Sequence, residues 1–346
     1  MLTIDQFTHK TTTILLLSIF SFCVAMLLTP LYTHIAYKYK LWKQHRTHAD
    51  TGEILTVINK LRIKRDVPLM AGLVGVIAIL ITTVLFNLER SQTWLPLAAL
   101  LGGGGVGLID DIINVRGKGG NVAGLRAPIK FSMILLVAAI GAWFFYYKLG
   151  YSTIHIPFEA YTHNINIGWG IIPLFILVVI STGNAVNISD GLDGLAGGLL
   201  VSAYSAIGVI AALQGKFGVA EFCMTVVGAL LAYVWFNIPP ARFFMGDVGS
   251  FSFGTALGVV AMLTNTLILL PLIGLVFVAE AGSSLIQIFS KRVFHRKIFI
   301  AAPLHYHLQA GDEGWPKTKV TMRFWVIGQV CGALGVILAL IGGYIH

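Results

Sequence analysis

Charge is scarce in this sequence, since only 11% of its 346 residues are Asp, Glu, Lys or Arg. Soluble domains carry about 25% charged residues, so the composition excludes an ordinary water-soluble enzyme and a disordered chain. Hydrophobic residues make up 56% of the sequence, and the mean hydropathy is +0.82. The composition therefore predicts a protein that crosses a membrane several times.

Cysteine is equally scarce, with Cys23, Cys223 and Cys331 as the three examples. They lie far apart inside apolar runs, which excludes a disulfide framework and a cysteine-based metal site. We expect them to be small buried apolar side chains. The chain also lacks low-complexity tracts, internal repeats, a separate soluble region and a cleavable signal peptide, because its first apolar run is too long for one. Residues 1–346 are predicted to form a single integral membrane domain.

Apolar runs of membrane-spanning length recur along the chain, each near the roughly 20 residues that a bilayer core requires. They predict an all-α polytopic membrane protein with about ten transmembrane helices and both termini on one side. The eighth and ninth runs are nearly continuous. The predicted helices lie at about 11–36, 67–88, 94–109, 128–147, 169–186, 194–213, 218–236, 248–264, 266–290 and 320–344.

Basic residues predict the orientation. One set of loops carries only Lys10, Arg90, Lys148 and Lys216, while the other side carries 20 of the 24 Lys and Arg residues. The positive-inside rule makes the second side cytoplasmic. Its loops are 37–66, 110–127, 187–193, 237–247 and 291–319. The net charge of +9 then indicates anionic lipid or an anionic substrate, with no need for a nucleic acid. On the opposite side, 148–168 forms either a small hairpin or an irregular loop.

Polar clusters gather on the predicted cytoplasmic side. Residues 184–196 read NAVNISDGLDGLA. If this segment opens a helix, Asp190 and Asp193 share one face near its N-terminus, with Asn187 as a cap or ligand. The alternative is a polar turn between two helices, because Asn, Asp and Gly dominate turns.

Two further acidic clusters flank this segment. Asp110 and Asp111 follow a glycine run at 102–107 whose simplest role is close helix packing. Adjacent carboxylates at a helix C-terminus repel each other, so we expect a cation or a proton there. Asp247 is either the N-cap of the eighth helix or a ligand for Mg²⁺, a cation that takes one or two protein carboxylates.

Ionisable residues of both signs accompany these carboxylates. Lys64 and Lys130 are either interfacial anchors or phosphate ligands. Glu280 lies within an apolar run, where an ionisable side chain indicates a functional site or a buried hydrogen bond. His305 and His307 could chelate zinc, but phosphate binding fits the acidic surroundings better. Together these residues predict Mg²⁺-dependent phosphoryl transfer at the cytoplasmic interface, between a lipid and a water-soluble substrate.

Several segments together resemble one enzyme family. GLIDD, NAVNISDGLDGLA, FFMGDVGS, APLHYH and GWPKTKVTMRFW are similar to motifs of the polyprenyl-phosphate N-acetylhexosamine-1-phosphate transferases, in order from about residue 64 to 330. Within that superfamily they most resemble the phospho-N-acetylmuramoyl-pentapeptide transferases. The resemblance implies ten membrane helices and a cytoplasmic active site. It also implies transfer of phospho-MurNAc-pentapeptide from UDP-MurNAc-pentapeptide to undecaprenyl phosphate, which yields UMP and lipid I, a peptidoglycan precursor. A homodimer is usual in the family.

The resemblance also implies roles for individual residues. Asp247 would be the main Mg²⁺ ligand with Asn187 beside it, and Asp110 of the Asp110–Asp111 pair would deprotonate or orient the lipid phosphate. Substrate binding would fall to Lys64 and Lys130. The nucleotide pocket would be formed by Asp190, Asp193, Asn237 and Phe244, with Phe244 stacked on uracil. Glu280 would match the acidic residue of the ninth helix, and His305 and His307 would belong to a histidine triplet.

This chain departs from the family pattern at Tyr306, which replaces the middle histidine, and at Leu69, which replaces a threonine. These departures bear on substrate detail, and a relative that acts on UDP-GlcNAc stays an alternative. Direct attack of the lipid phosphate on the β-phosphorus and a covalent aspartyl route both stay open. A secondary transporter for an anionic solute is the rival from another class, although its charges would be expected near the membrane midplane.

Overall fold

The protein is a helical bundle, described here from a computed structural model that covers residues 4–42, 67–116, 124–158, 164–311 and 313–345. Ten helices of 15 residues or more occur in these residues. They are α1 (Ile4–Lys38), α3 (Gly72–Phe86), α4 (Trp94–Arg116), α5 (Ala127–Trp143), α6 (Ile171–Ser189), α7 (Leu195–Leu213), α8 (Phe217–Asn237), α9 (Gly246–Leu263), α11 (Leu275–Val293) and α13 (Lys317–Ile341).

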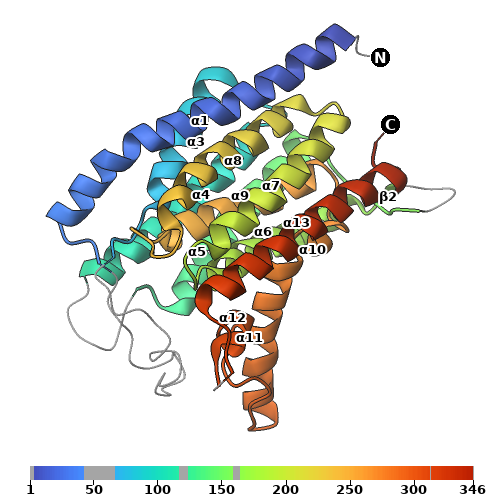
Figure 1. Ribbon diagram of the computed structural model, residues 1–346. Coiled ribbons are helices and arrows are strands. Elements are labelled where there is room, and N and C mark those ends of the chain that lie inside the picture. Colours follow the sequence, from blue (N-terminus) through green and yellow to red (C-terminus); the bar gives the residue numbers. More distant parts are fainter. Residues whose placement is uncertain (1–3, 43–66, 117–123, 159–163, 312, 346) are drawn as a thin grey trace.

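Within the described residues, eight helices are long and apolar enough to cross a membrane. The other two of the ten differ for local reasons, because α3 has only 15 residues and α11 ends in the basic Lys291 and Arg292. The all-α polytopic membrane class is therefore confirmed. Most helices run nearly parallel in one bundle, with α1 along one outer edge and α13 along another (Figure 1).

The centre of the bundle is α9, of whose residues 94% are buried. It packs against α4, α6 and α3. The predicted packing role of the glycine run in α4 is confirmed. A Cβ at Gly107 would fall on the backbone of Asp247, and one at Gly103 on the backbone of Phe251. Small residues thus let the two backbones approach closely, which brings the end of α4 that carries Asp110 against the start of α9.

The predicted ninth run, 266–290, is not one helix. The chain turns at Asn265, which has φ +56, and forms the single turn α10 (Leu270–Ile273) before α11 begins. α11 then leaves the bundle at a steep angle to the other helices (Figure 1). The apolar run therefore correctly indicated an apolar segment, but it did not show that the chain turns and interrupts the helix within this segment.

The segment 148–168 contains a small hairpin, which was one of the two alternatives that the sequence left open. β1 (Thr153–His155) pairs antiparallel with β2 (Asn164–Asn166), and Ile154 lies opposite Ile165. A π-helical turn, η1 (Phe144–Lys148), and a 3₁₀ turn, η2 (Gly168–Gly170), flank it. The start of α1 and the end of α13 lie at the same end of the bundle as the hairpin (Figure 1).

Candidate active site

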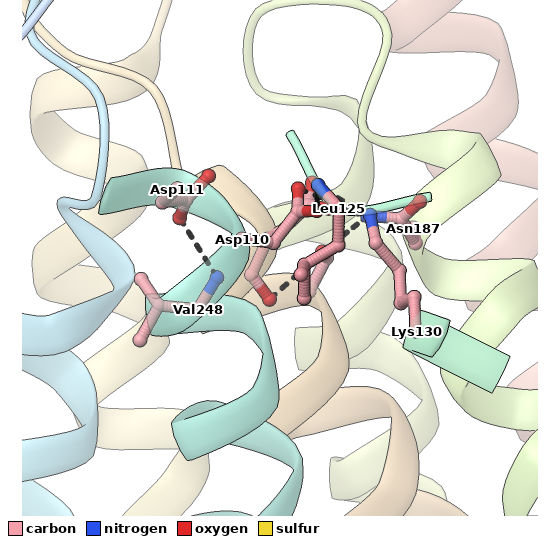
Figure 2. A network of polar contacts seen from close by, with 8 residues as sticks. Asp110, Asp111, Leu125, Lys130, Asn187 and Val248 are labelled. Carbon is pink, nitrogen blue, oxygen red and sulfur yellow. Dashed lines mark hydrogen bonds and ion pairs between the residues drawn. The ribbon is translucent and has the colours of Figure 1, made fainter. Parts of the chain in front are cut away.

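Asp110 and Asp111 are buried on α4, with 3% and 1% exposure. The helix was expected to stop near residue 109, but it continues to Arg116, so the pair lies inside the helix. The two carboxylates have different partners. Asp111 Oδ2 accepts a hydrogen bond from the Val248 N–H at 2.9 Å, at the positive N-terminus of α9. Asp110 Oδ1 accepts one from the Leu125 N–H at 2.6 Å. Figure 2 shows both contacts.

Lys130 supplies the cation that the acidic pair was expected to need. Its Nζ lies 3.0 Å from Asp110 Oδ2 and 2.5 Å from Asp247 Oδ2. The ammonium also lies 5.5 Å from the centre of the Phe251 ring. Since the Lys130 side chain is only 20% exposed, both ion pairs are shielded from water and stronger than surface pairs. The lysine thus joins α5 to carboxylates on α4 and α9.

Asn187 approaches the same carboxylate from the last turn of α6. Its Nδ2 donates to Asp247 Oδ1 and to Ser250 Oγ, both at 2.9 Å. The amide orients the Asp247 carboxylate, while Lys130 holds its other oxygen. Residues on α4, α5, α6 and α9, separated by more than a hundred positions, therefore converge on one point at one end of the bundle (Figure 2).

The donor set fits a hard divalent cation. Asp110, Asp111 and Asp247, called here the aspartate cluster, offer carboxylate oxygens that lie within 4.8 Å of one another. Oxygen-only ligands at this density suit Mg²⁺, and an ammonium group already lies between two of the carboxylates. Asn187 presents its amide nitrogen to Asp247, so its contribution in this structure is to orient the carboxylate.

Asp190 and Asp193 do not open a helix. α6 ends at Ser189 and α7 begins at Leu195, so the two aspartates occupy the turn 190–194. The polar-turn interpretation is the correct one for the local structure. Asp193 Oδ2 accepts a hydrogen bond from the Ala241 N–H at 3.1 Å, which ties the turn to the loop 238–245 between α8 and α9.

Asn237 connects the same two segments, and both polar atoms of its side-chain amide make hydrogen bonds. Its Oδ1 accepts from the Gly194 N–H at 2.7 Å, and its Nδ2 donates to Phe243 O at 2.8 Å. The residue is 2% exposed, so it acts as a buried clamp. Phe244 is half-buried and packs on the small cluster of Leu69, Met70 and Val248. A role for these residues in nucleotide binding stays a prediction.

Glu280 and His305 form a buried pair, and both side chains are completely inaccessible to solvent. Glu280 Oε2 lies 2.7 Å from His305 Nδ1, and Glu280 Oε1 accepts the His305 N–H at 3.0 Å. His305 Nε2 is buried without a hydrogen-bond partner among the described residues. It faces Gly191, where any Cβ would collide with the imidazole. The pair thus holds an imidazole against the turn 190–194.

His307 does not join this pair. On the short helix α12 (Leu304–Gln309), residues two apart point in different directions. The ring of His307 accepts a hydrogen bond from the Ile300 N–H at 3.3 Å and packs against Phe299. Because the two imidazoles have different partners, His305 and His307 do not form a zinc site together in this structure. Tyr306, between them, is buried beside the His305 ring. Lys64 lies outside the described residues.

Several contacts of the site could not be read from the sequence. The Leu125 and Val248 amides and the Ser250 hydroxyl contact its acidic and amide groups, yet such donors occur in every chain. On α13, Trp325 donates to Gly194 O at 3.0 Å and Thr321 donates to Asp193 O at 3.3 Å. The only sequence signal for this second pair was their presence in the terminal segment of the family resemblance.

Comparison with known proteins decides the family. The profile of glycosyl transferase family 4 matches residues 93–265, a span that contains Asp110, Lys130, Asn187 and Asp247. The phospho-N-acetylmuramoyl-pentapeptide-transferase of Chloroflexus aggregans is 37% identical over 343 residues, which cover 95% of this chain and 90% of that protein. The chain belongs to the phospho-N-acetylmuramoyl-pentapeptide transferase family.

A second relative agrees with this membership. The phospho-N-acetylmuramoyl-pentapeptide-transferase of Geobacillus sp. strain WCH70 is 35% identical over 323 residues, covering 92% of this chain and 95% of that protein. Because both alignments run over nearly the whole length, the family resemblance extends beyond the aspartate cluster to the helices that carry it. The family expectation from the sequence motifs is therefore confirmed.

Proposed function

We propose that the protein transfers phospho-MurNAc-pentapeptide from UDP-MurNAc-pentapeptide to undecaprenyl phosphate, releasing UMP and forming lipid I. The observation that carries the proposal is the convergence of Asp110, Lys130, Asn187 and Asp247 at one end of a membrane bundle. Carboxylates and a cation in one shielded place are what a transferred phosphoryl group requires. The names of the two relatives supply the transferred group, phospho-N-acetylmuramoyl-pentapeptide, and the resemblance of the sequence motifs supplies the UDP carrier and undecaprenyl phosphate.

In this proposal the lipid phosphate approaches from the membrane and the nucleotide sugar from the water side. A phosphate oxygen of the lipid attacks the β-phosphorus of the UDP-sugar, and the bond from that phosphorus to the oxygen of UMP breaks. Asp110 holds or accepts the proton of the attacking phosphate. The Leu125 N–H and the Lys130 ammonium hold its carboxylate in a fixed position at the centre of the site.

Lys130 has two roles in turn. In the substrate-free protein its ammonium neutralises Asp110 and Asp247. A diphosphate that enters the site brings its own negative charge, and we expect the ammonium to turn toward it. Asp247 would hold Mg²⁺, which when bound offsets the charge on the diphosphate and on the leaving UMP. Asn187 keeps the Asp247 carboxylate in a fixed orientation.

The direct test uses the purified protein with undecaprenyl phosphate and Mg²⁺, offered either UDP-MurNAc-pentapeptide or UDP-GlcNAc. We expect UMP release and a lipid-linked product with the muramoyl substrate. Equal turnover of UDP-GlcNAc would assign the chain to a different substrate branch. A phosphorylated Asp110 after exposure to the nucleotide substrate alone would replace direct attack by a two-step route.

A further inference from the structure

A cavity opens on the outer side of the bundle, and none of its lining residues belongs to the aspartate cluster. It has a volume of about 500 Å³ and lies between the C-terminal half of α1 and the end of α8 with its following loop. We call it the α1–α8 cavity. Its lining residues are Thr29, Pro30, Thr33, His34, Tyr37, Lys38, Phe236, Arg242 and Phe243.

The two charged side chains that line the cavity, Lys38 and Arg242, are both basic. His34 and Lys38 come from α1, and Arg242 comes from the loop 238–245, about two hundred positions away. None of the described lining residues is acidic. Lys38 alone could serve only to offset the negative C-terminus of α1. Arg242 lies in the loop 238–245 and not on α1, so the negative C-terminus of α1 does not explain why a second basic side chain lines this cavity.

The walls of the cavity are aromatic and its surroundings are apolar. Phe243 is buried, and the guanidinium of Arg242 lies 5.9 Å from the centre of the Phe236 ring. On α1, the side chains of Leu27, Leu31 and Ile35 are 79%, 59% and 41% exposed. On a membrane-spanning helix such residues face acyl chains. The cavity thus offers positive charge and an adjoining apolar surface, which together match an amphiphile with an anionic head.

We propose that the α1–α8 cavity binds the headgroup of an anionic phospholipid of the bilayer, with its phosphate near Arg242 and Lys38 and its acyl chains along α1. The phosphate of the polyprenyl substrate has to reach Asp110 and Asp247, and the cavity contains neither of them nor Lys130. The bound lipid would contact the loop that leads into Asp247, because Phe243 lies in the cavity wall and its carbonyl accepts the Asn237 amide.

The test measures lipid retention by the purified full-length protein, without nucleotide substrate. Wild type and the Lys38→Gln/Arg242→Gln variant are mixed with phosphatidylglycerol, phosphatidylcholine or undecaprenyl phosphate and examined by native mass spectrometry. We expect the wild type to prefer phosphatidylglycerol over phosphatidylcholine. Two basic residues near a membrane surface predict roughly 30-fold weaker phosphatidylglycerol binding in the double variant.

A matched control is Arg292→Gln/Lys297→Gln, which removes the same charge from exposed positions near the end of α11. It should retain phosphatidylglycerol like the wild type. The proposal is overturned if the control loses as much lipid, if phosphatidylcholine binds equally well, or if the double variant loses undecaprenyl phosphate alone. Arg242→Gln alone, tested in parallel, removes one basic residue and should weaken phosphatidylglycerol binding roughly 5-fold, which keeps the proposal testable if the double variant does not fold.

Discussion

At the scale of single residues, the site depends on a compensated set of charges. Asp110 and Asp247 both contact one ammonium group, while Asp111 is satisfied by the backbone of α9. Buried carboxylates without such partners would be too costly to keep ionised. Each member of the set therefore has its own expected effect when removed.

Asp247→Asn keeps the shape of the side chain but removes its charge. We expect the rate of UMP release to fall by at least about 100-fold, since a carboxylate that contacts Lys130 and faces Asp110 is lost from the centre of the site. Asp5→Asn, at an exposed position of α1, is the control and should leave the rate unchanged. Near-normal activity of Asp247→Asn at saturating Mg²⁺ would contradict the role given to this carboxylate.

Lys130→Met leaves Asp110 and Asp247 facing each other without the ammonium. In the presence of a chelator we expect a loss of up to about 3 kcal/mol in unfolding free energy, because breaking a shielded ion pair strands its partners. Added Mg²⁺ should restore more stability to this variant than to the wild type. Lys148→Met, at an exposed position after α5, should show neither effect in thermal unfolding. A variant insensitive to Mg²⁺ would speak against a cation site in the aspartate cluster.

At the scale of the elements, the contact between α4 and α9 positions the site. The glycines of α4 let its backbone reach that of α9, and Gly107 lies directly against Asp247. A larger residue there would displace Asp247, which belongs to the aspartate cluster, as well as the helix that carries it. Gly105, two residues earlier, points away from the contact, because a Cβ there would meet nothing within 4 Å.

The two glycines form a matched pair for mutation. Gly107→Ala should cost about 1–3 kcal/mol of stability through overpacking and should also lower the rate of UMP release. Gly105→Ala should be neutral or slightly stabilising, because alanine favours a helix more than glycine does. Yield after extraction, thermal unfolding and UMP release would be measured for both. Equal effects of the two substitutions would exclude the close helix contact as the cause.

The turn between α7 and α8 predicts a pH dependence of stability. Lys216 donates to Leu263 O at 2.6 Å, and burial lowers its pKa from 10.5 to about 8. The unfolded chain therefore holds more protons than the folded one between pH 8 and 10.5, and stability should increase as the pH rises through this window. Thermal unfolding between pH 7 and 9.5 should show this increase. Lys216→Met should remove the slope, and an unchanged slope would refute the assignment.

At the scale of the whole molecule, polar chemistry is concentrated at one end. The end of α4, the turn between α6 and α7 and the short helix α12 lie toward one end of the bundle, and the hairpin, the start of α1 and the end of α13 lie toward the other (Figure 1). The first group carries Asp110, Asp111, the turn 190–194 and His305. The excess of basic residues on the loops of the first end predicts that this end is cytoplasmic.

Orientation can be measured by labelling single cysteines. Cys23 is exposed, so the prediction that all three cysteines are buried is wrong for this residue, and Cys23→Ser removes it from the background. Lys297→Cys then lies near the end of α11 and Lys148→Cys lies beside the hairpin, both at exposed positions. A membrane-impermeant thiol reagent added to intact cells should label only Lys148→Cys, and inside-out vesicles should give the reverse. The opposite pattern would move the proposed active site to the outer face.

The sequence predicted the helices better than their ends. Hydrophobicity located ten long helices because the cost of exposing polar backbone to lipid depends on local composition. It missed the continuation of α4 past Asp110 and the break before α11, since the end of an apolar run is not the end of a helix. It also left the turn at Asp190 open, which the backbone hydrogen bonds of α6 and α7 decided.

The sequence by itself determined that the chain is a multi-pass helical membrane protein, which residues are ionisable, and, through its motifs, the family to which it belongs. Only the tertiary structure decided which of these residues meet. It joined Lys130 to Asp110 and Asp247, paired Glu280 with His305, and turned His307 away. The reason is physical: partners for a buried charge come from whichever helix packs beside it, and helix packing depends on side-chain shapes across the whole bundle.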